Sequence, residues 1–214
     1  DEVLERFGAT LILSGTSFLI CSMIGILFGI LSSAFQYSFF DKMITFSVIL
    51  GISIPSFFLG MMMILFFTVE LRLLPASGMY SLYGGGDLID LLKHLIMPST
   101  ALAIVSTGVV VRLSRSIMLE ILRLDFIRTA RSKGLKEYRV IFIHAFRLAI
   151  VSILPILGLQ AGFVLSGAVY IEIVFQWPGV GRMLVDSILT RDIMLVQGGV
   201  CLLYTSPSPR DRVL

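Results

Sequence analysis

The chain has 214 residues, of which 57% are hydrophobic and only 14% are charged, and its mean hydropathy is +0.96. Soluble domains contain about 45–50% apolar residues, so this composition excludes an ordinary soluble domain and indicates an integral membrane protein. Because one crossing takes about 20 apolar residues, the length suits a single membrane domain of about five spans.

Apolar segments separated by short polar connections predict an all-α membrane bundle. The first segment is uncharged, and its Gly25 and Gly29, four residues apart, favour close packing against another helix. The second contains Pro55, which lacks a backbone donor and kinks or breaks helices. The last is too short to cross a bilayer. The expected spans are about 8–34, 43–69, 95–117, 148–171 and 193–203.

Two groups of small or helix-breaking residues are candidates for a translocation path. The kink around Pro55 either lines the bundle interior or is only a packed kink, and the residues support both readings equally. In the fourth span, small residues repeat every four positions, which is typical of tight helix packing and, as a second reading, of a pore-lining face. The candidate path residues are Ser53, Pro55, Ser56, Gly158, Gly162 and Ser166.

The connecting segments carry further expectations. Residues 70–94 are polar and rich in glycine, which indicates an extramembrane loop, and no Walker A pattern follows these or any other glycines. Trp177 stands beside a turn and is expected in an interfacial aromatic belt. We interpret residues 201–214 as a non-native tail, residues 1–200 as the transmembrane domain, and the whole chain as a fragment.

One basic segment, residues 112–147, holds nine of the seventeen Lys and Arg residues and only three acids. The positive-inside rule places it in the cytoplasm and accounts for the net charge of +3 without a nucleic-acid partner. Alternation across the spans then puts residues 36–42 inside and residues 1–7, 70–94 and 172–192 outside.

Within this basic segment a short helix is predicted from Asp125 to Gly134. Asp125 is expected to accept hydrogen bonds from the first free amides, and Gly134 is expected to take the left-handed position after the last turn. Phe126, Ile127 and Ala130 would form an apolar side opposite the basic residues. Such a helix could dock into a partner, although a solvated loop that only sets the topology is the alternative reading.

The residues of this helix read R-T-A-R-x-K-G-L, from Arg128 to Leu135. Four other stretches accompany it in order, GISIPSF (51–57), LPASG (74–78), HLIMP (94–98) and VFQWPGVG (174–181). Together they resemble the permease subunits of binding-protein-dependent ABC importers, in the branch that handles dipeptides, oligopeptides and nickel. Arg128 and Thr129 stand where the general EAA loop has Glu and Ala, and Phe146 and Arg147 stand where it has Leu and Pro, departures typical of this branch.

The resemblance implies a type I (MetI-like) helical bundle with a cytoplasmic coupling loop over residues 119–147. It also implies a multi-pass protein of the bacterial or archaeal inner membrane, in contact with lipid, that forms the path for peptides, with nickel and glutathione left open. The implied partners are a second homologous permease, an external substrate-binding protein and two cytoplasmic ATPase subunits. Those ATPases, and not this subunit, would hold ATP-Mg and hydrolyse it. The implied ATPase contacts are Asp125, Phe126, Arg128, Thr129, Ala130, Arg131, Lys133, Gly134 and Leu135.

The alternative classes are a proton-coupled secondary transporter and an intramembrane enzyme. Both need titratable or catalytic groups inside the spans, and no acid falls in the middle of a predicted span. His94 and His144 fall on opposite faces of the membrane in this topology, so they cannot share one metal or catalytic site. We therefore expect neither a catalytic residue nor a metal site in this chain.

Overall fold

The computed structural model describes residues 2–81 and 86–204, and this part of the chain is helical without strands. Two short segments, η1 and η2, are π-helical, and the other elements are α-helices. The elements are α1 (Glu2–Ala34), α2 (Phe39–Ser53), α3 (Ser56–Met63), η1 (Ile64–Glu70), α4 (Leu88–Ile121), α5 (Asp125–Ser132), α6 (Glu137–Arg139), η2 (Val140–Ala145), α7 (Phe146–Val174), α8 (Val180–Thr190) and α9 (Ile193–Tyr204).

Three helical stretches of the described chain are long and apolar enough to cross a membrane, namely Val3–Ala34, Leu88–Ile121 and Glu137–Val174. They contain the first, third and fourth predicted spans; the first extends beyond its span only at the N-terminal end, and the other two extend at both ends. Each crossing is therefore longer than its purely apolar part, because polar residues continue the helix outside the bilayer.

The second predicted span, 43–69, is not one kinked helix. Ile54 and Pro55 are extended, and the helical stretches Phe39–Ser53 and Ser56–Glu70 on either side meet at 97°. Proline disfavours a helical conformation in the residue before it, so the helix ends at Ser53 instead of bending. If this broken pair counts as one crossing, the described residues contain up to four spans instead of five.

The last apolar segment forms α9, which has 12 residues and is too short to span a bilayer, as its sequence predicts. Of the predicted tail 201–214, residues 205–214 lie outside the described residues. The boundary at residue 200 therefore stays a prediction.

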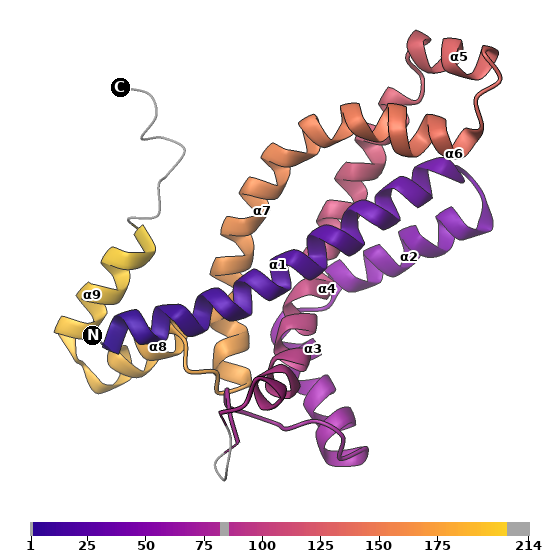
Figure 1. Ribbon diagram of the computed structural model, residues 1–214. Helices are drawn as coiled ribbons and strands as arrows, with labels where there is room; N and C mark the ends of the chain where they lie inside the picture. The colour runs from indigo at the N-terminus through magenta and orange to yellow at the C-terminus, as the bar shows by residue number, and fades with distance from the viewer. Residues whose placement is uncertain (1, 82–85, 205–214) are drawn as a thin grey trace, which may run out of the picture.

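The helices lie with their ends grouped as the predicted topology requires (Figure 1). The connection between α1 and α2 lies at the same end as α5, and the N-terminus lies at the opposite end with α8. An apolar cluster at the first end includes Met118, Ile127 and Val140, and a second at the other end includes Leu13 and Trp177. We call these the cytoplasmic and external ends.

α1 lies along α4, in the most extensive helix contact of the described chain. A Cβ added at Gly25 would stand 2.6 Å from the Val110 side chain, and one added at Gly29 would stand 2.6 Å from Cβ of Ser114 and 3.0 Å from the Val111 carbonyl oxygen. The predicted packing role of the two glycines is thus confirmed. They allow two backbones to approach as small residues do in membrane bundles.

A Gly29→Ala variant tests this contact. Ser114 Cβ and the Val111 carbonyl are fixed to the backbone, so α1 must move away from α4, and we expect a loss of about 1–3 kcal/mol in unfolding free energy. The control is Gly15→Ala in the same helix, where nothing lies within 4 Å of the added atom. Thermal unfolding of the purified protein in detergent should show a lower Tm for Gly29→Ala only. Equal Tm values for the two variants would contradict the close contact.

Candidate functional site

The predicted coupling helix exists as α5, and it is held against the rest of the chain by two side chains. Ile127 is fully buried and Ala130 nearly so, in the apolar cluster that includes Met118 of α4 and Val140 and Ile141 of η2. The other residues of α5 are exposed. The helix therefore attaches by one narrow face and presents the remainder outward at the cytoplasmic end.

The end of α5 has the geometry expected from the sequence. Gly134 has a φ of +75°, its N–H donates to the Arg131 carbonyl at 2.9 Å, and the Leu135 N–H donates to the Ala130 carbonyl at 3.4 Å. This pair of bonds is the Schellman motif, which needs a left-handed residue after the helix. Arg131 also pairs with Glu137 at 2.7 Å, which ties α5 to the returning chain.

Two expectations for the start of α5 were wrong. Leu124 is the N-cap and Asp125 is already the first helical residue, so its carboxylate caps no amide and instead faces Arg128 at 3.6 Å. Phe126 does not share the buried side with Ile127, because 43% of it is exposed. Residues one apart on a helix point about 100° from each other, and only Ile127 and Ala130 fit the narrow contact.

The predicted ATPase-contact residues fall into two groups, those that face the chain's own apolar cluster and those that are exposed. Ala130 and Leu135 face the chain's own apolar cluster, Leu135 only in part. The rest are exposed, and we call them together the α5 surface: Asp125, Phe126, Arg128, Thr129, Arg131, Lys133 and Gly134.

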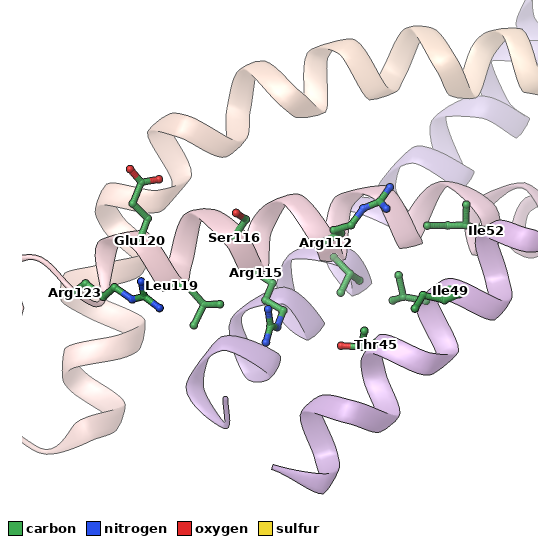
Figure 2. Close-up of a pocket in the computed structure, with 11 residues that line it drawn as sticks. Thr45, Ile49, Ile52, Arg112, Arg115, Ser116, Leu119, Glu120 and Arg123 are labelled. Atoms are coloured by element: carbon green, nitrogen blue, oxygen red, sulfur yellow. The ribbon is translucent and has the colours of Figure 1, made fainter. Parts of the chain in front are cut away.

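A hollow of about 740 Å³ lies between α2 and the cytoplasmic end of α4 (Figure 2). Its α2 wall includes Thr45 and Ile49, and its α4 wall carries arginines and one carboxylate among apolar residues. Arg115 and Leu119 extend from α4 toward α2, whereas Ser116 and Glu120 extend to the other side of the helix. The polar residues of the α4 wall and the following turn are Arg112, Arg115, Ser116, Glu120 and Arg123.

An ion pair between a buried carboxylate and a partly buried guanidinium lies at the cytoplasmic end of the bundle. Arg115 donates from Nε to Oδ1 of Asp41 at 2.9 Å and from Nη2 to Oδ2 at 2.8 Å, and its Nε also lies 2.9 Å from the Ser32 hydroxyl oxygen. The Ser32 hydroxyl donates to the same carboxylate, whose side chain is only 5% exposed. The bidentate pair therefore joins α1, α2 and α4.

A second buried carboxylate organises the external end. Glu172 is fully buried and accepts a hydrogen bond from the Thr10 hydroxyl at 2.6 Å and from the Arg182 amide at 3.1 Å. Thr10 in turn accepts from the Val180 amide at 2.9 Å. These bonds hold the turn between α7 and α8 against α1.

Trp177, within the same turn, is not in an interfacial belt. It is fully buried, and its indole N–H donates to the Ala9 carbonyl at 2.8 Å. The expectation was wrong because the sequence around a tryptophan beside Pro-Gly is the same whether the ring lies at the membrane interface or inside the bundle. Only the position of α1 distinguishes the two cases.

Inside the membrane region, a hollow of about 360 Å³ is lined by residues of α3, α4 and α7. Ser56 is the one predicted path residue that lines it. Ser53 donates its hydroxyl to the Ile49 carbonyl at 2.8 Å, and Pro55 is exposed at the break. The lining residues are Ser56, Leu102, Val105, Ser106, Val109, Gln160, Phe163 and Gly167.

The predicted small-residue stripe lies elsewhere on α7. Gly158, Gly162 and Ser166 are exposed, and nothing lies within 4 Å of a Cβ added at either glycine. Gln160, two residues from each glycine, is turned from them by about 200° around the helix. The stripe therefore packs against no helix within the described chain, and its part in a path stays a prediction.

The chain matches the family described as "Binding-protein-dependent transport system inner membrane component" over residues 25–206. The chain belongs to this family. It is thus a multi-pass inner-membrane permease of the ABC import class. The two alternative classes, a proton-coupled transporter and an intramembrane enzyme, are therefore wrong. Permeases of this family are membrane components and not enzymes.

Curated relatives of this permease are named as peptide transporters. It is 38% identical over 222 residues to the di/tripeptide transport system permease protein DppB of Pseudomonas aeruginosa, covering 95% of this chain and 66% of that protein. It is also 38% identical over 226 residues to the dipeptide transport system permease protein DppB of Escherichia coli K12, covering 96% and 67%. The chain thus spans about two thirds of the length of these relatives.

A solved structure shares the permease fold. The permease superposes on a chain of the MetNI methionine ABC transporter, in a structure of its inward-facing conformations, with a TM-score of 0.73 and 16% identity. The match covers 94% of this chain and 89% of that one. The type I helical bundle expected from the sequence is confirmed.

Sequence reasoning missed the polar residues that join distant helices, namely Asp41, Arg115, Glu172 and Gln160. Asp41 belongs to the predicted polar connection 36–42, Arg115 to the end of the third predicted span and the basic segment, and Glu172 to the start of the expected external loop. One usable signal is present for Glu172 and Gln160: each is a single polar residue within an apolar segment, where an unpartnered polar group is costly.

The Asp41–Arg115 pair can be tested with Asp41→Asn. The change leaves a partly buried guanidinium facing a neutral amide, so we expect a loss of about 2 kcal/mol in unfolding free energy, below the cost for a fully buried pair. The control is Asp186→Asn, which removes an exposed partner of Arg182 and should cost about 0.2–1 kcal/mol. Thermal unfolding in detergent measures both. A Tm for Asp41→Asn equal to that of the control would show that the pair contributes little.

Proposed function

We propose that this permease forms the inward path for di- or oligopeptides and is driven through α5 by cytoplasmic ATPases. The observation that carries the proposal is the α5 surface, a basic and aromatic face that stands out at the cytoplasmic end while Ile127 and Ala130 hold it to the bundle. The peptide class is supported by relatives whose names state di- and tripeptide transport. Nickel and glutathione remain other candidates for the substrate.

The proposed assembly contains a second homologous permease, two ATPase subunits and an external substrate-binding protein. ATP and Mg²⁺ belong to the ATPase subunits, and this permease supplies no catalytic group. Phe126 is suited to enter a cleft of the ATPase, because an exposed aromatic ring offers a large apolar contact at a docking surface. Arg128 and Lys133 would favour an acidic rim around that cleft.

The attachment of α5 suggests how motion would pass into the membrane. Ile127 and Ala130 contact the base of α4 and the π-helical turn that begins the α7 stretch. A closing ATPase pair that moves α5 would therefore move the cytoplasmic ends of two crossing helices together. Rigid-body movement of packed helices about a path is the general scheme of alternating access.

A Phe126→Ala variant tests the docking role. Because Phe126 is largely outside the permease core, its removal should leave the permease folded but reduce co-purification of the ATPase by about tenfold or more, as for a central aromatic contact. The matched control is Phe142→Ala, a phenylalanine of η2 that is 44% exposed and lies outside α5. The measurement is the ATPase retained per permease after co-expression with the ATPases encoded beside it.

Equal retention of ATPase by the Phe126→Ala variant and the unmodified permease would contradict docking through α5. Loss with both variants would locate the contact on a broader surface than α5 and would contradict it too. Peptide import by the whole complex in proteoliposomes, with its binding protein, is a separate measurement. Absence of import for di-, tri- and oligopeptides would overturn the substrate class.

A further inference from the structure

Three uncharged polar side chains from three elements meet inside the membrane-crossing part of the bundle. Ser56 begins α3, Ser106 lies in α4 and Gln160 lies in α7, and all three line the hollow of about 360 Å³. The wall between them is apolar, formed mainly by Leu102, Val105, Val109 and Phe163. Few polar groups among apolar walls are typical of a small-molecule site, whose volume is about 300–1,000 Å³.

Gln160 lies near the middle of α7. It is residue 160 of a helix that runs from 146 to 174, fourteen residues from each end. Ser106 is eighteen residues from the start of α4 at 88 and fifteen from its end at 121. Both side chains therefore lie near the middle of their crossings, where no lipid headgroup reaches.

Gln160 and Ser106 are buried and Ser56 is half-buried, and none of the three side chains has a partner within the described chain. Gln160 is 6% exposed and Ser106 is 8% exposed, and neither side chain, nor that of Ser56, forms a hydrogen bond with any residue that the structure describes. Other hydroxyls of α4, such as those of Ser99 and Thr107, donate to carbonyls of their own helix. Among the described residues, the enclosed polar atoms that lack a partner are the hydroxyls of Ser22 and Thr68, so the amide of Gln160 is open to the hollow that it lines. It is therefore available to a partner from outside the chain.

We infer that the hollow lined by Ser56, Ser106 and Gln160 binds the backbone amide of the transported peptide partway across the membrane. The inference rests on the proposed peptide substrate. A glutamine side chain carries one acceptor and two donors and can pair with both the N–H and the C=O of a peptide unit. The apolar walls contact the peptide side chains without a charged group that would select among them.

The path that leaves this hollow continues along α4. Val109 lines the membrane hollow, and Arg112 and Ser116, three and seven residues further on, line the cytoplasmic hollow of Figure 2. Residues at this spacing lie on one face of a helix. The same face of α4 thus leads from the buried amide of Gln160 toward the cytoplasmic end.

The experiment compares Gln160→Leu with Gln160→Asn in the complete transporter, with its binding protein, in proteoliposomes. Import of a labelled dipeptide should fall about tenfold in Gln160→Leu, the effect of one lost hydrogen bond to a buried polar group, and should be largely kept in Gln160→Asn. ATPase activity stimulated by the binding protein should change less than about twofold, because docking and coupling lie elsewhere. Gln197→Leu, the same change at an exposed position of α9, is the matched control.

The outcomes separate this inference from the proposed function. If the unmodified complex imports the dipeptide and the Gln160→Leu complex imports it equally well, the site is overturned and the proposed function stays intact. Parallel loss of import and ATPase activity, or equal loss in Gln160→Asn, would assign Gln160 a structural role and overturn the site as well. A second variant, Ser106→Ala, should lower import in the same direction without changing the Tm.

Discussion

The close contact between α1 and α4 is the interaction on which the other features depend. In a bilayer, lipid is as apolar as leucine, so two helices associate through tight packing and hydrogen bonds instead of the hydrophobic effect. Gly25 and Gly29 let α1 approach α4 closely over the cytoplasmic half, and the Ser32–Asp41–Arg115 bonds continue that contact where the helices leave the apolar region. Packing and an ion pair therefore fix the base on which α5 sits.

That base explains why a short helix such as α5 can be stable outside the membrane. Eight residues do not form a stable helix alone. α5 exists because Ile127 enters a cluster already formed by α4 and η2, and because Gly134 and Leu135 satisfy its last carbonyls. A partner that pulled on the α5 surface would act on these few contacts, which lie directly beside the ends of two crossing helices. Because so few contacts hold α5, most of its surface is free for a partner.

Local features could be predicted from the sequence, and features that depend on another helix could not. The long crossings, the glycine approach and the left-handed Gly134 follow from composition, spacing and backbone chemistry. Phe126 was misplaced because an eight-residue helix can turn either side to its support, and Asp125 was misplaced because Leu124, and not Asp125, is the N-cap of α5. Trp177 and Glu172 were assigned to a membrane interface and an external loop, because their burial depends on α1, which is more than 160 residues away in the chain. Gln160 was overlooked because one amide in an apolar helix does not disturb its periodicity.

The two most buried polar side chains of α7 show what separates structure from function in this membrane domain. The carboxyl group of Glu172 is far more costly to bury than an amide. The Thr10 hydroxyl and the Arg182 backbone N–H donate to it, and these bonds position α1 and the turn between α7 and α8. Gln160, twelve residues earlier on the same helix, has none of these partners although Ser106 lies across the hollow from it. The amide of Gln160 instead faces the hollow, where the proposed partner is the peptide in transit.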